Sequence, residues 1–186
     1  MARGPFQRHR DGSVGVRLPA GLRLVLIDQM RQLDQLLDTG RSDEASTDPL
    51  AELTGMTGVS GERARPDDAA LLRLRPDAYA ADIDEGRAAA EFRRFTEGDL
   101  EALQRARVAA VIETLSEGDR FDLDEEQAQA WVGALNDLRL AQASRLGIED
   151  DDALERLPPT PALQMFGLLG ALLHDLLVAL GAPDDF

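Results

Sequence analysis

The sequence predicts a mainly α protein, a helical bundle of about five to six helices with a small N-terminal β-hairpin. Apolar residues recur at helical spacing over long stretches of the chain. Two of these stretches begin with complete helix-capping patterns, whereas alternation of apolar and polar residues is confined to the first 18 residues. A chain of 186 residues is long enough to bury a core, and we interpret 1–186 as a single domain.

The first element is the hairpin, which occupies 1–18 and has its strands within Phe6–Leu18. Asp11-Gly12 is a favoured two-residue turn signal, and Val14 and Val16 alternate with polar residues on the outgoing strand. An isolated hairpin is marginally stable in water. We therefore expect this one to pack on helices or to pair with another chain.

Three further segments follow the hairpin. The spacing of leucines after Pro19 predicts a first helix over 19–38. Residues 39–66 are polar and rich in glycine, which predicts a flexible loop region. Residues 67–186 form the expected helical bundle, which opens with short helices at 67–74 and 82–94.

Two helix starts in the bundle are marked by capping residues. Thr96 is placed to cap a helix that continues to about Ser116. Asp124 is placed to cap another helix, with Gln127 as its reciprocal partner, and Gly147 follows the end of that helix.

The last predicted helix, 162–180, is apolar on nearly every side and ends at Gly181. We interpret it as a buried core helix rather than a membrane span, because Asp175 would be costly in a bilayer. A helix of this composition is central in a bundle or lies against a partner chain. A homodimer through this helix or through the hairpin follows as one expectation, and no membrane association is expected.

Composition excludes several classes of function. The chain has 35 acidic and 20 basic residues, a net charge of −15, no cysteine and two histidines, and every basic residue is arginine. Thiolate, disulfide and zinc-finger chemistry are absent from it, and no cofactor or metal site is expected. The acidic charge makes nucleic-acid binding unlikely as a general property. The N-terminus has no apolar segment of the signal-peptide type, which predicts a cytoplasmic protein.

Polar residues interrupt two predicted apolar faces. On helix 97–116, Gln104 and Arg107 fall among the apolar positions. On helix 124–146, Arg139 falls within the apolar arc and Asn136 lies at its edge, while Asp137 is expected to point outward.

A buried guanidinium must be paired, because an uncompensated buried charge costs several kcal/mol. Two interpretations follow for Gln104, Arg107, Asn136 and Arg139: a site for an anion or a partner protein, or internal salt bridges. For internal salt bridges, the candidate carboxylate partners of the two arginines are Asp77, Asp82 and Glu91. The acidic clusters 82–86 and 119–126 lack the closing ligand of a calcium loop and are interpreted as solvated or helix-capping groups.

Several sequence blocks, taken in order along the chain, resemble those of a known protein family. They are Arg75-Pro76-Asp77-Ala78-Tyr79, then 89–97, then 131–140, together with the N-terminal hairpin. The chain resembles an actinobacterial family catalogued as a domain of unknown function, DUF2017. Members of that family are encoded beside the Clp protease adaptor ClpS and near sulfur-carrier and cysteine-biosynthesis genes, and some are labelled transcriptional regulators. The resemblance implies no catalytic residues.

Three hypotheses for function remain. The first is a non-catalytic interaction or regulatory protein with an unidentified protein partner, linked to adaptor-dependent Clp proteolysis. The second is a DNA-binding transcriptional regulator that uses the basic N-terminal hairpin, since residues 1–23 contain five arginines and one acid. The third is a small enzyme or anion-binding protein with a pocket around Arg107 and Arg139.

Overall fold

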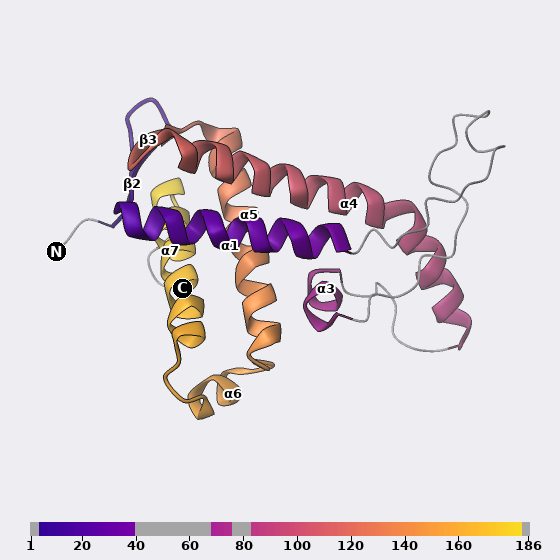
Figure 1. Ribbon diagram of the computed structural model, residues 1–186. Helices are drawn as coiled ribbons and strands as arrows, with labels where there is room; N and C mark the ends of the chain where they lie inside the picture. Colours follow the sequence, from indigo (N-terminus) through magenta and orange to yellow (C-terminus); the bar gives the residue numbers. More distant parts are fainter. Residues whose placement is uncertain (1–3, 40–67, 76–82, 184–186) are drawn as a thin grey trace, which may run out of the picture.

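A computed structural model describes residues 4–39, 68–75 and 83–183 of the chain (Figure 1). These residues form six helices and a small antiparallel sheet, so the predicted fold class is confirmed. The predicted loop region 39–66 lies almost entirely outside the described residues, as do Asp77 and Asp82.

The sheet has three strands in the order β1-β2-β3, namely β1 (Phe6–Arg8), β2 (Val14–Arg17) and β3 (Arg120–Leu123). The predicted hairpin supplies β1 and β2. Its connection is longer than the predicted two-residue turn, because Phe6 pairs with Val16 and the amide of His9 donates to the carbonyl of Ser13. β3 was not predicted and lies within the acidic cluster 119–126.

The helices are α1 (Ala20–Thr39), α3 (Ala69–Leu74), α4 (Ile83–Glu117), α5 (Glu125–Arg145), α6 (Asp151–Arg156) and α7 (Pro161–Leu180). The capping box of Asp124 and Gln127 is present at the start of α5. The predicted start at Thr96 is wrong, because α4 runs through it as one helix of 35 residues. The short helix α6 was not predicted.

α1 and α4 run antiparallel and lie side by side (Figure 1). Near the start of α1, Arg23 donates to the carbonyl of Leu115 and to Asp119 at the far end of α4. Farther along, Arg105 of α4 donates to Asp34 and Asp38 at 2.9 and 2.8 Å. α5 packs against both of these helices and also against α3, α7 and β3, so it is the central element.

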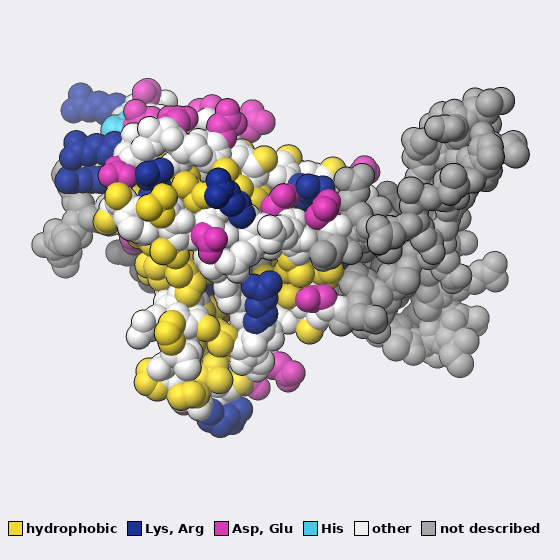
Figure 2. Space-filling model, in the orientation of Figure 1, with side chains coloured by type: hydrophobic (Ala, Val, Ile, Leu, Met, Phe, Trp, Pro, Cys, Tyr) yellow, Lys and Arg dark blue, Asp and Glu magenta, His cyan; other side chains and the backbone are white. Residues whose placement is uncertain are grey.

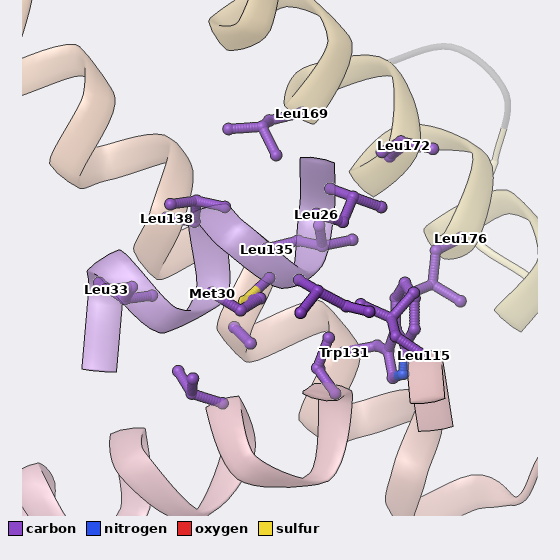
Figure 3. Close-up of a cluster of buried hydrophobic side chains, with 14 of the residues drawn as sticks. Leu26, Met30, Leu33, Leu115, Trp131, Leu135, Leu138, Leu169, Leu172 and Leu176 are labelled. Carbon is purple, nitrogen blue, oxygen red and sulfur yellow. The ribbon is translucent and has the colours of Figure 1, made fainter. Parts of the chain in front are cut away.

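Trp131 of α5 lies between the sheet and the helices. Figure 3 shows it beside Leu115 in the buried hydrophobic cluster. Its ring is fully buried, with the Phe6 ring edge-on at 5.9 Å and the Phe121 ring at 5.8 Å between centroids. The indole N–H donates to the hydroxyl of Thr114 on α4 at 2.9 Å, and Thr114 is also buried. One side chain therefore joins β1, β3, α4 and α5.

α7 lies along one side of α5 and is less enclosed than a core helix (Figure 1). Four of its twenty residues are buried, namely Phe166, Leu169, Leu172 and Leu176. The expectation of a buried core helix is therefore wrong for most of its surface. By length and composition alone α7 is apolar enough to cross a membrane, but in this fold its buried side is part of the protein core.

The hydrogen bond from Trp131 gives a test of this junction. Replacing Thr114 by valine keeps the shape but leaves the indole N–H unsatisfied, which should lower the free energy of unfolding by about 1–3 kcal/mol. Urea unfolding followed by the fluorescence of the single tryptophan measures this change. Thr114→Ser keeps the hydroxyl and should retain most of the stability. Equal losses in the two variants would show that the hydrogen bond is unimportant.

Candidate functional site

The four residues of the predicted site lie in two different places. Gln104 and Arg107 of α4 face Asp137 of α5, whereas Arg139 lies against Phe166 of α7. Asn136 is half-buried. A single pocket that joins both arginines is therefore not formed by the described residues.

The first place is a buried polar cluster between α3, α4 and α5. Arg75 Nη1 lies 3.7 Å from Glu101 Oε2, and Arg75 Nε donates to Gln104 Oε1 at 3.4 Å. Gln104 also hydrogen-bonds Asp137, which experiences the positive charges of Arg107 and Arg75. Two guanidinium groups and two carboxylates thus compensate each other within this cluster, which we call the polar cluster.

Asp137 corrects the sequence prediction, because it is 8% exposed rather than pointing outward. The cause is the position of α5, which is covered by helices on several sides and has little outward surface near this residue. Burial raises the pKa of the Asp137 carboxyl, while Arg107, the hydrogen bond from Gln104 and Arg75 act against that rise. The ionised carboxylate therefore has a net unfavourable environment in the fold.

The Arg107 side chain crosses α5 at a glycine. A Cβ at Gly133 would lie 2.7 Å from Arg107 Cδ and 2.8 Å from its Nε, closer than ordinary contacts allow. The absence of a side chain at Gly133 therefore gives the guanidinium its path over the helix.

Arg139 makes a different set of contacts. Its guanidinium carbon lies 4.6 Å from the centroid of the Phe166 ring, a cation–π contact, and its Nε passes close to Gly170. That Nε is buried and makes no hydrogen bond within the described part of the chain. Arg139 therefore acts chiefly as packing between α5 and α7.

One turn farther along α5, Gln142 donates to Gln29 of α1 at 2.8 Å.

The acidic cluster after α4 is engaged in structural contacts. Asp119 accepts from Arg23, Asp122 lies 3.2 Å from His9 Nε2, and Asp124 caps α5. In the described ranges, no three histidine, cysteine, aspartate or glutamate side chains are grouped to hold a metal ion.

A surface groove of about 1040 Å³ lies where the hairpin, the start of α1 and α7 meet, and we call it the α7 groove. Its apolar lining includes Pro5, Leu18, Pro19, Leu22, Leu168 and Leu172. Its charged lining consists of Arg17, Asp119, Arg120 and Asp175. Figure 2 shows hydrophobic side chains over α7 and arginine side chains at the hairpin end of the molecule. The sequence did not predict this groove, because the residues that line it are far apart in the chain.

The protein is therefore a small helical protein whose buried charges compensate each other and whose surface has a partly apolar groove. The model of the domain of unknown function DUF2017 matches residues 3–180. The chain therefore belongs to the DUF2017 family, in agreement with the resemblance seen in its sequence blocks. No solved structure matches the chain.

Mycobacterial proteins are similar to a large part of the chain. The Mycobacterium leprae protein named "Putative oxidative stress regulator AosR" is 37% identical over 131 residues, which are 63% of this chain and 59% of that protein. The Mycobacterium tuberculosis H37Rv protein named "Oxidative stress regulator AosR" is 34% identical over 128 residues, 62% of this chain and 58% of that protein. The matched segment thus spans less than two thirds of these curated relatives.

Removing the charge of Asp137 tests whether the polar cluster is strained by burial. Because the folded pKa is raised above the unfolded value, the ionised group lowers stability at neutral pH, and this cost disappears as pH falls and the folded protein binds a proton. Asp137→Asn should therefore be at least as stable as the native protein at pH 7, with an advantage that shrinks towards pH 4. Chemical unfolding at both pH values measures the difference.

The exposed carboxylate Glu113 on α4 supplies the control, because Glu113→Gln removes the same charge from the surface. A strong loss of stability at pH 7 in Asp137→Asn would instead show that its pairing with Arg107 outweighs the cost of burial.

Two glycines in helix interiors form a matched pair. A Cβ at Gly167 of α7 meets nothing within 4 Å, so Gly167→Ala should gain about 0.5–1 kcal/mol from helix propensity. Gly133→Ala should gain less or lose stability, because Arg107 must move away from its place beside Asp137. Thermal unfolding of both variants measures the difference, and equal gains would refute the close crossing of Arg107.

Proposed function

We propose that the protein is a non-catalytic regulator that acts by binding another protein through the outer side of α7 and the α7 groove. The observation that carries this proposal is the apolar, partly exposed surface of α7. Its 20 residues include one acid, Asp175, and no arginine, although 30% of the whole chain is charged. Loss of charge together with accessible apolar area is typical of protein interfaces.

The interior supports a binding role rather than catalysis. The predicted arginines lie against other elements of the fold, since Arg107 crosses α5 at Gly133 and Arg139 lies over the Phe166 ring. Asp137 has a raised pKa, but it is buried within the polar cluster and does not line the α7 groove. An acid–base enzyme needs such a group within reach of a substrate.

The names of the mycobacterial relatives support a regulatory role, since they are designated oxidative stress regulators. We extend regulation to this chain as part of the proposal. The 186 residues contain no cysteine, so a response to oxidants through this chain does not use a thiol or disulfide of its own. We therefore propose that the regulatory effect depends on binding to a partner rather than on thiol chemistry of this chain.

Two finer parts of the proposal come from the sequence. One is a cytoplasmic location. The family resemblance points to a partner in adaptor-dependent Clp proteolysis. Calorimetric titration of the purified protein with the purified Clp adaptor tests that partner, and no heat of binding at micromolar concentrations would exclude it.

A second copy of the chain also fits this surface, through α7 or through the hairpin. The uncharged side of α7 is where two copies of a chain of net charge −15 repel each other least. Light scattering over a range of protein concentrations tests self-association. A constant monomer mass would exclude a stable homodimer and leave a different protein as the partner.

A charge placed on α7 tests the proposed function. Ala171 is exposed and lines the α7 groove, so Ala171→Glu should abolish the recovery of specific partner proteins in affinity purification from cells that encode the chain. Ala109→Glu, at an exposed position on α4 away from the groove, is the matched control and should recover the same proteins as the native chain. Recovery that is equal in both variants would contradict a role for α7.

A further inference from the structure

Two arginines lie directly opposite each other on neighbouring strands of the sheet. Arg17 of β2 pairs with Arg120 of β3 in the antiparallel register, and both are exposed. Their neighbours Val16 and Phe121 are buried, so the two guanidinium groups leave from the outer face of the sheet. Residues that are directly opposite have Cβ atoms about 4.5–5.5 Å apart, and like charges at this spacing are destabilising.

The protein does not neutralise this pair internally. Within the described part of the chain, neither Arg17 nor Arg120 makes an ion pair or a side-chain hydrogen bond. The acids next to the pair on β3 are engaged elsewhere, because Asp119 accepts from Arg23 and Asp122 pairs with His9. Asp175 of α7 also lines the groove, but it makes no ion pair with either arginine within the described residues. Both guanidinium groups therefore keep their donors available for a molecule outside the chain.

The arginine pair also lies on the boundary between two surface hollows. Both residues line the α7 groove, and both line a second hollow of about 430 Å³ on the outer face of the sheet. In the second hollow the His9 ring crosses directly over Gly15, where a Cβ would overlap the ring. Because both arginines also line the α7 groove, a charged group that binds them lies next to the apolar wall of that groove, formed by Leu18, Leu22 and Leu168.

We propose that Arg17 and Arg120 clamp a carboxylate of an acidic partner segment, whose neighbouring apolar side chains lie in the α7 groove. This inference rests on the proposed function, and it adds the chemistry of the partner. Paired guanidinium groups match a carboxylate in charge and hydrogen-bonding geometry. The apolar wall of the groove complements apolar side chains next to that carboxylate.

Charge favours a short acidic segment over a nucleic acid at this place. The chain has a net charge of −15, which repels an extended polyanion over its whole length. A segment with one or two carboxylates experiences mainly the local pair of arginines at the groove. It also supplies the apolar contacts that a phosphate backbone lacks.

Peptide binding tests the clamp. The probe is a fluorescein-labelled peptide of alternating leucine and glutamate, and the control probe has glutamine in place of glutamate. Fluorescence polarisation should show saturable binding of the acidic peptide, with affinity about tenfold lower for Arg17→Glu and for Arg120→Glu, and likewise for the glutamine peptide. Arg10→Glu removes an arginine that lines neither hollow and should bind as the native protein does.

The same variants separate binding from folding. Arg17→Glu replaces a like-charge pair by an opposite-charge pair with Arg120, so its unfolding midpoint should rise while peptide binding falls. A merely structural arginine pair would not show these opposite changes. A lower midpoint in Arg17→Glu would contradict the strained like-charge pair on which the proposal depends.

Other outcomes would overturn the clamp. Equal binding of both peptides, or equal affinity in the native and variant proteins, would refute it. Binding of a labelled oligonucleotide that Arg17→Glu abolishes would assign the site to phosphate, and a dimer that Arg17→Glu dissociates would assign it to a second copy. If Ala171→Glu loses its partners while Arg17→Glu keeps them, the clamp fails but the proposed function stands.

Discussion

The packing of Trp131 is the interaction on which the rest of this structure depends. A three-stranded sheet of short strands has little stability of its own and must bury one face against helices. Trp131 provides that surface, since its ring contacts Phe6 and Phe121 from the sheet and its N–H is satisfied by Thr114. The buried face of the sheet is therefore fixed, and its outer face with Arg17 and Arg120 is presented in a defined position beside α7.

Charges compensate each other in the interior but not at the groove. In the polar cluster, Arg75, Glu101, Arg107 and Asp137 compensate each other, so the arginines on the inner faces serve the fold. At the surface, Arg17 and Arg120 face each other and neither makes an ion pair within the described ranges. The exposed arginines at the groove, rather than the buried ones, are therefore the ones that we propose as contacts for a partner.

Local signals predicted the elements that are stabilised locally. The capping box of Asp124 and Gln127 and the left-handed glycines Gly147 and Gly181 mark helix ends by interactions within a few residues, and these ends were confirmed. β3 was missed because Arg120–Leu123 becomes a strand by pairing with β2, about a hundred residues earlier in the chain. The position of Asp137 and the division of Arg107 and Arg139 between two places depend on which helices surround α5, and helical spacing alone does not contain that information.

The central claim is that Trp131 joins the sheet to the helices as one cooperative unit. Hydrogen exchange of its indole N–H, the single tryptophan signal in a proton–nitrogen NMR spectrum, tests this most directly. We expect this proton to exchange only as fast as the most protected amides of α5 and of β2, because all three become exposed in the same opening. An indole proton that exchanges much faster than those amides would show that the sheet separates from the helices without unfolding them, and that Trp131 does not join the two.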